Sequence, residues 1–246
     1  MLTEPFGAKN LTVTVDAYRI KVLDAIAPVS SITAYNNCFN FNKTSNPTYS
    51  ITNPFCQLIQ RNAVTGDRAQ VLALYSNLGT IETQGVDVTA AWNHDLGPGV
   101  FGVNATLSYL DYYKYQPDTA SKQNDATGTL DQGGQFDYRL LTNFTYKWND
   151  FNFGLQWRHL PSVESAAKAI SATTTQQGAP SYDVFGLTGS YSFGRYTLRA
   201  GVDNVLDQAP PSINAIPGGD TNSDTTNPSY YDVLGRRYFV GLKAKF

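Results

Sequence analysis

Residues 100–109 read VFGVNATLSY, and this alternation decides the fold. The odd positions are apolar and the even positions are small or polar: Phe101, Val103, Ala105, Leu107 and Tyr109 against Gly102, Asn104, Thr106 and Ser108. Successive side chains of a β-strand point to opposite faces, so one face of this strand prefers hydrocarbon and the other prefers water. In a soluble sandwich the polar face would point outward. In a transmembrane barrel the apolar face would meet lipid and the polar face a wet lumen.

The same alternation recurs along the chain. It predicts strands over 11–22, 83–93, 100–112, 137–148, 151–160, 182–193, 196–206 and 235–246. Very short connections, rich in Gly, Asn and Asp, alternate with long polar ones: 95–99, 149–150 and 194–195 against 24–82, 113–136, 161–181 and 207–234. Short turns at one end and long loops at the other are typical of bacterial outer-membrane barrels. The sequence therefore predicts an all-β antiparallel meander of about eight strands.

Aromatic residues distinguish lipid from a soluble core. They gather at the short-turn end of the predicted strands and again farther along the apolar faces: Trp92, Phe101, Trp148, Phe151, Phe193, Tyr196 and Phe246, then Tyr109, Trp157, Phe185 and Tyr238. Tyr and Trp concentrate at both membrane interfaces. Strands favour aromatic residues in any case, but two rows at matching depth favour a membrane.

Composition narrows the class of protein. Charged residues make up 15% of the chain, which is low for a soluble surface, and the formal net charge is -2. Nothing in this balance indicates a nucleic-acid partner. The predicted environment is the lipid of the outer membrane.

The amino terminus has no features of an export signal. Met1 is followed by LTEPFG, without a basic stretch or an apolar core. An outer-membrane protein needs such a signal, so we expect residues 1–246 to be a single region, the carboxyl-terminal portion of a longer protein whose signal peptide and other domains are absent here.

Four segments resemble TonB-dependent receptors, in the order found in that family. They are LTVTVDAYRI at 11–20, NLGTIETQGVD at 77–87, GVDNVLD at 201–207 followed by Pro210-Pro211, and the closing YDVLGRRYFVGLKAKF at 231–246. The resemblance implies that the chain is the last part of a 22-stranded barrel with an amino-terminal plug. It implies an energised importer of siderophore-, vitamin- or carbohydrate-type substrates. The implied partners are the plug of the full-length chain, the TonB energy-coupling protein and the barrel-assembly machinery.

Alternating strands also occur in two other classes of protein. A self-contained eight-stranded outer-membrane barrel could serve as an anchor or adhesin. Its interior should be tightly packed with charged side chains, whereas this polar face carries many small groups: Gly85, Gly102, Gly154, Gly186, Thr188 and Ser190. A soluble enzyme or lipocalin-like binder is the third class. The two histidines, His94 and His159, have no Ser or Cys at a recognisable catalytic spacing, so we expect neither an enzyme nor a bound cofactor or metal.

Two groups of residues are predicted to have specific roles in the outside loops. Cys38 and Cys56 lie in the longest of these loops, and we expect a disulfide because an exported loop meets an oxidising compartment. The alternative is a pair of free thiols in a soluble protein. Tyr109, Tyr112, Tyr113 and Tyr115 offer stacking surfaces at the loop end of a strand, so they are candidate ligand contacts. They could equally form the upper aromatic girdle.

Two further groups of residues, on the polar face and in the last strand, are predicted to have specific roles. Cationic and amide side chains of the polar face should hold the plug or line a substrate path: Arg139, Asn143, Lys147, Gln156, Arg158, Arg199, Arg237 and Lys243. In the last strand, apolar side chains form an outward stripe that we expect to act as the assembly signal: Tyr238, Val240, Leu242 and Phe246. Such a stripe suits capture by strand addition.

Overall fold

The computed structural model describes residues 2–3, 9–41, 43–117, 122–130, 134–165, 167–168, 171–173, 178–213 and 226–245. Contacts within the chain define two units. The first, here called the sheet unit, comprises Met1–Tyr18, Gln84–Tyr112 and Ala126–Phe246. The second, the loop unit, comprises Arg19–Thr83 and Tyr113–Asp125.

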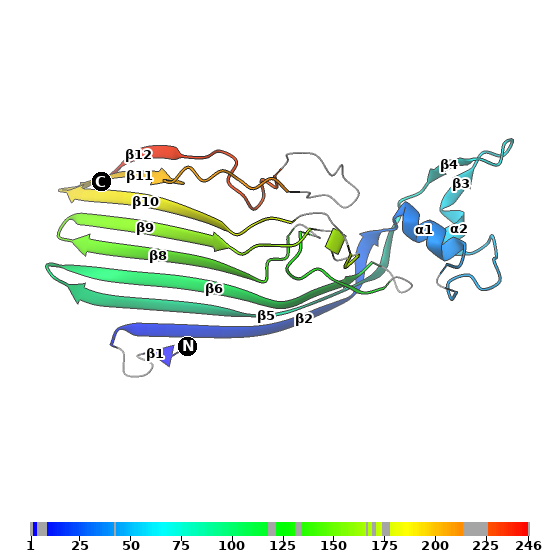
Figure 1. The fold of residues 1–246 in the computed structure, drawn as a ribbon, viewed down its shortest axis with the longest axis horizontal. Helices are drawn as coiled ribbons and strands as arrows, with labels where there is room; N and C mark the ends of the chain where they lie inside the picture. Colours follow the sequence, from blue (N-terminus) through cyan, green and yellow to red (C-terminus); the bar gives the residue numbers. More distant parts are fainter. Residues whose placement is uncertain are drawn as a thin grey trace. The chain divides into compact units, whose positions relative to one another are not determined.

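Ten described strands form one sheet, in the order β1-β2-β5-β6-β8-β9-β10-β11-β12, with β7 paired to β6 (Figure 1). Their bounds are β1 Leu2–Thr3, β2 Leu11–Pro28, β5 Tyr75–Leu96, β6 Gly99–Gln116, β7 Asn124–Asp125, β8 Tyr138–Trp148, β9 Phe151–Leu160, β10 Tyr182–Phe193, β11 Tyr196–Asp203 and β12 Arg237–Ala244. The pairs from β6 to β12 are antiparallel. The all-β meander is confirmed. Within the described residues β12 pairs with β11 alone, so the sheet is open.

Register places the predicted apolar residues on one face. A single row across the sheet runs through consecutive strands: Val103, Phe144, Leu155, Leu187, Val202 and Tyr238. Each directly opposed pair adds a few tenths of a kcal/mol to about 1 kcal/mol of stability. At the short-turn end the aromatic rings contact one another; Phe151 and Tyr191, for example, have centroids 4.5 Å apart. This face is continuous, as the alternation predicts.

The short turns of the sheet unit lie together at one end of the strands (Figure 1). Each carries a residue with positive φ, namely Gly97 at 58°, Asn149 at 48° and Gly194 at 55°. Gly and Asn adopt this left-handed conformation at low cost, which is why these residues specify tight hairpins.

Several predicted strand bounds were wrong. β2 continues to Pro28 rather than residue 22, β5 begins at Tyr75 rather than residue 83, and β6 ends at Gln116 rather than residue 112. In these extensions apolar and polar residues do not alternate strictly, as in LDAIAP at 23–28, so the pattern does not mark them as strand.

Two further predictions about strand ends need correction. β11 and β12 are shorter than predicted, ending at Asp203 and beginning at Arg237. β2 is not the edge strand of the sheet, because β1 pairs with its first residues, Leu2 opposite Val13 and Thr3 opposite Thr12.

The loop unit contains helices and strands in the segment 24–82, which was predicted to be a long loop. It holds α1 (Ser31–Cys38), α2 (Pro54–Gln57) and the antiparallel pair β3 (Ile59–Arg61) and β4 (Arg68–Val71). Ser30 Oγ accepts from Thr33 N at 3.0 Å, and Asn53 Oδ1 accepts from Phe55 N at 3.0 Å, so both helices have polar caps. No described helix is long and apolar enough to cross a membrane.

A small apolar core stabilises these helices. Its buried members are Val29, Ala34, Cys38 and Ile59, and Tyr35, Phe55, Cys56, Leu58 and Val71 pack against them. Cys38 and Cys56 form a disulfide whose Cα atoms are 4.7 Å apart. The bond joins the end of α1 to α2, so it fixes the two helices to each other.

Candidate functional site

Connections between strands fold over the polar face of the sheet unit at its loop end. They bury one apolar cluster: Leu130, Phe136, Val163, Ala179, Tyr182, Val184, Ile213 and Tyr231. Val184 lies opposite Arg158 in the register and therefore belongs to the face that the sequence reading treated as polar. Alternation alone could not assign this apolar residue, because what covers it comes from distant parts of the chain.

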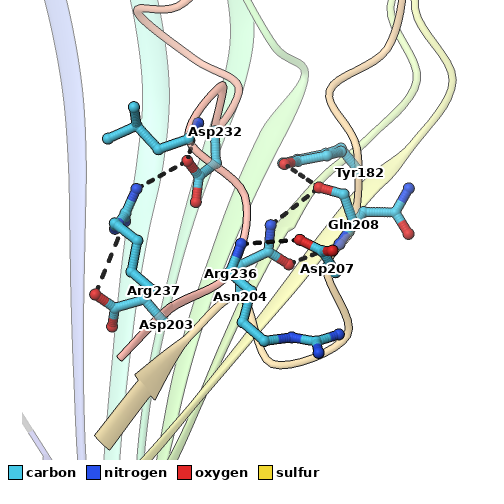
Figure 2. A network of polar contacts seen from close by, with 9 residues as sticks. Tyr182, Asp203, Asn204, Asp207, Gln208, Asp232, Arg236 and Arg237 are labelled. Carbon is cyan, nitrogen blue, oxygen red and sulfur yellow. Dashed lines mark hydrogen bonds and ion pairs between the residues drawn. The ribbon is translucent and has the colours of Figure 1, made fainter. Parts of the chain in front are cut away.

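A polar network anchors the connection that follows β11 (Figure 2). Asn204 ends the strand with a φ of 51° and is 1% exposed. Its Oδ1 accepts from Gln208 N at 2.8 Å, and its Nδ2 donates to Gln208 O at 3.0 Å. Tyr182 Oη donates to the same carbonyl at 3.3 Å, so β10 is linked to this turn.

The same network reaches the start of β12. Asp207 Oδ1 accepts from Arg236 N at 2.9 Å. Arg237 lies between two carboxylates, with Nη1 3.0 Å from Asp232 Oδ1 and Nη2 3.8 Å from Asp203 Oδ2 (Figure 2). The two motif segments at 201–207 and 231–246 thus contact each other, and their polar residues hold the last connection against the sheet.

This anchoring positions Ser229 and Tyr230 over a pocket of about 410 Å³. We call it the arginine pocket; it is lined by Thr106, Ser108, Arg139, Leu140, Leu141, Arg158, His159, Leu160, Tyr182, Val184, Ser229 and Tyr230. Two guanidinium groups and several hydroxyl groups therefore surround one volume of suitable size for a small ligand.

Three contacts hold the Arg139 side chain in place. Its guanidinium carbon lies 5.0 Å from the Phe136 ring centroid and 5.5 Å from that of Tyr230. Its Nη2 donates to Gly134 O at 3.3 Å. Cation–π contacts with these two adjoining rings fix the group without neutralising its charge.

Positive charge is in excess on this face of the last strands. Among the described residues, the cations of this face without a carboxylate within ion-pair distance include Arg139, Lys147, Arg158, Arg199 and Lys243. An unpaired guanidinium presents several fixed donors that match carboxylate, phosphate or catecholate oxygens. The arrangement is suited to binding an anion.

The predicted tyrosine cluster is divided by the fold. Tyr109 is exposed and lies opposite Tyr138, whereas Tyr112 points to the other face of β6 and donates from Oη to Gln84 Oε1 at 3.3 Å. Tyr113 and Tyr115 belong to the loop unit. None of the four lines the arginine pocket. Phe246 of the predicted assembly signal lies outside the described residues.

Residues 3–205 match the family model described as TonB dependent receptor-like, beta-barrel. The chain belongs to this family. Members are outer-membrane proteins, so the apolar face of the sheet meets lipid and the polar face lines the lumen. No curated protein matches the chain.

Solved structures of TonB-dependent receptors have the same fold. The copper transporter OprC aligns with a TM-score of 0.54 and 16% identity, over 97% of this chain and 29% of that one. The FrpB iron transporter from Neisseria meningitidis gives 0.55 and 13%, over 96% and 29%. The ferric enterobactin receptor PfeA from Pseudomonas aeruginosa gives 0.60 and 15%, over 96% and 29%. The chain thus spans about 29% of these receptors.

Four side chains on the lipid-facing side of the sheet form a hydrogen-bonded polar cluster. His159 Nδ1 is 2.8 Å from Asp183 Oδ1, Trp157 Nε1 donates to the same oxygen at 2.7 Å, and Tyr138 Oη is 3.1 Å from His159 Nε2. These mutual contacts satisfy polar groups near the loop end, as an interfacial belt requires. No group of three potential metal ligands occurs among the described residues.

Proposed function

We propose that the chain is the carboxyl-terminal barrel segment of an energised outer-membrane importer, and that the arginine pocket binds an anionic, siderophore-type chelate. The observation that carries the proposal is the fixed, uncompensated charge of Arg139 beside Arg158 in a pocket under the loops. Iron, copper and siderophore transporters among the structural neighbours support it.

The lining of the pocket separates substrate classes. Amides and carboxylates commonly bind a neutral carbohydrate, whereas the described lining of this pocket contains no Asn, Gln, Asp or Glu. Both Arg residues line the same volume without a described carboxylate in ion-pair distance, so an anion there would gain charge-assisted hydrogen bonds from each. A neutral sugar would offer these donors only hydroxyl oxygens, which gain less from a guanidinium than a charged oxygen does.

The remaining partners follow from the same proposal. Cations on the polar face outside the pocket, Lys147 and Arg199, would face acidic or carbonyl groups of the plug. The TonB energy-coupling protein would act through that plug, and the barrel-assembly machinery would insert the chain into the lipid. Because the chain spans a minor part of its structural neighbours, transport requires the remainder of the receptor.

A binding experiment tests the pocket directly. The chain is folded into detergent micelles and titrated with a ferric tris-catecholate, and quenching of Trp fluorescence is followed. Arg139→Gln and Arg158→Gln should each weaken binding about 10-fold or more, because a hydrogen bond to a charged group contributes about 1.5–3 kcal/mol.

Lys243→Gln is the matched control, since Lys243 lies on the same face outside the pocket. Its affinity should stay within about twofold of the parent, an effect too small for a lost direct contact. Equal weakening by all three variants would indicate general charge attraction, and tighter binding of a neutral oligosaccharide than of the chelate would overturn the proposed substrate class.

A further inference from the structure

The loop unit contains a groove of about 700 Å³ that the proposed import function does not use. One side is formed by β3, and the other by Phe39, Tyr49 and Ile51. These three side chains are 42%, 66% and 80% exposed. Large apolar side chains grouped around a hollow in contact with water mark an interaction site more often than a structural one.

The backbone at Tyr49, whose side chain is exposed, is strained. Its φ is 52°, a left-handed conformation in which a bulky residue is strained. The buried side chain of Asn46 holds this turn, since its Oδ1 accepts from Ser50 N at 2.9 Å and its Nδ2 donates to Ser50 O at 3.1 Å. Gly or Asn would relieve the strain, so the exposed ring is not there to satisfy the turn.

β3 lines this groove, and its edge away from β4 has no strand partner among the described residues. On the β4 side, Leu72 N donates to Leu58 O at 2.9 Å and Asn62 N donates to Asp67 O at 2.8 Å. In an antiparallel pair the backbone groups of alternate residues point to opposite edges. Leu58, Gln60 and Asn62 therefore face β4, and Ile59 and Arg61 direct their N–H and C=O groups the other way.

No strand occupies that second edge in the described residues, where β3 and β4 form a two-stranded sheet. Ile59, Gln60 and Arg61 all line the groove. An edge of unpaired N–H and C=O groups is a template for another extended chain. The groove thus lies beside a strand with unpaired backbone donors and acceptors, and exposed apolar side chains also line it.

Charge defines the kind of chain that fits. Between Val29 and Leu74 the cations are Lys43, Arg61 and Arg68, and the single acidic residue is Asp67. Arg61 lies at the groove itself. An occupant with acidic side chains would be favoured over a basic one.

We propose that this groove binds an extended peptide segment of another protein by strand addition to β3. The backbone of the segment would pair with Ile59 and Arg61. Its apolar side chains would contact Phe39, Tyr49 and Ile51, and its acidic side chains would approach Arg61. The groove and the arginine pocket share no lining residue, so the two proposals can be tested independently.

The first test uses the 246-residue chain in detergent micelles and a short fluorescent peptide in which Glu alternates with Phe. Binding is measured by fluorescence anisotropy. N-methylation of one alternate set of peptide amides should abolish binding, and methylation of the other set should not, because only one set faces β3. A Lys-for-Glu peptide should bind at least about 10-fold more weakly.

Variants of the chain separate backbone pairing from side-chain contact. Arg61→Ala and Arg61→Pro both remove the guanidinium, but only Arg61→Pro removes the N–H that faces the groove. Arg61→Pro should therefore bind at least about 10-fold more weakly than Arg61→Ala. Intact circular dichroism and an unreactive disulfide serve as the folding check.

Ile51→Ser and Tyr49→Ser give a second route that leaves β3 unchanged. Each should weaken the peptide several-fold, whereas Val64→Ser, at a site 93% exposed and outside the groove, should not. Equal affinity for both N-methylated peptides would exclude strand addition. Binding of a neutral oligosaccharide that Tyr49→Ser abolishes, with no peptide binding, would make the groove a glycan site and overturn the proposal.

Discussion

Asn204 shows how one side chain ends a strand and begins a loop. Its positive φ stops β11, and its amide makes two hydrogen bonds to the backbone of Gln208 in a buried position. Asn tolerates the left-handed conformation better than other non-glycine residues. The turn therefore depends on both the conformation and the polarity of a single residue.

Asn204→Ala should lower the free energy of unfolding of the sheet unit by about 2–3 kcal/mol, from two lost hydrogen bonds and greater backbone strain. Asn149→Ala is the matched control, because Asn149 has a similar φ of 48° in an exposed turn. It should cost about 1 kcal/mol. Denaturant unfolding in micelles measures both; equal losses would show that the buried amide contributes nothing.

Tyr231 has a buried hydroxyl without a hydrogen-bond partner among the described residues. Burial raises the pKa of Tyr231 from 10.0 to about 12. The neutral phenol is favoured in the folded state, so this contribution to stability is fully present below pH 10 and is lost as the pH rises towards about 12.

Tyr231→Phe should leave stability at pH 7 unchanged or raise it by up to about 1 kcal/mol, because an unsatisfied polar atom is removed. Its stability should also fall less than that of the parent between pH 10 and 12. Thermal unfolding across this range is the measurement. Exposed Tyr49→Phe is the control; identical alkaline profiles for parent and Tyr231→Phe would contradict the assignment.

At the scale of elements, the disulfide joins two short helices that could not be stable alone. Cys38→Ser with Cys56→Ser should lower the stability of the loop unit by about 3 kcal/mol in the loop-entropy account. Limited proteolysis should cut between residues 31 and 71, while β8 to β10 stay protected. Thiol titration of the exported chain should find no free sulfhydryl, and two reactive thiols would contradict the pairing.

The last strand exposes a stripe of apolar side chains on an open edge. Tyr238, Val240 and Leu242 are all exposed on β12. We expect this stripe and the terminal Phe246 to be recognised by strand addition during assembly. In a full-length receptor gene, Phe246→Ala should reduce membrane insertion several-fold more than Lys245→Ala. Undiminished insertion of both variants would remove the assembly role.

At the scale of the whole molecule, the large apolar face belongs in lipid, whereas the open sheet edge carries backbone groups that need a partner strand. We expect the isolated chain to aggregate in buffer without detergent, because unpaired edges and exposed apolar rows associate. Sedimentation with and without micelles is the measurement. A monodisperse soluble monomer in plain buffer would contradict the lipid-facing assignment.

The sequence by itself predicted the eight long strands of the sheet, the face on which most of their apolar residues lie, and the family. Alternation in 100–109 depends only on neighbouring residues and on the two solvents that a strand separates, so β8, β9 and β10 were located within one residue of their observed bounds. The motifs at 201–207 and 231–246 also pointed to the family, although their contact was not visible in the sequence.

Only the tertiary structure decided where the candidate sites lie. Arg139 was predicted as one polar-face residue among many, and its role depends on Tyr230, a residue far along the chain. Val184, the helices of the loop unit and the groove beside β3 likewise depend on which connections fold back and pack. Contacts between distant segments follow from packing in three dimensions, which no local periodicity records.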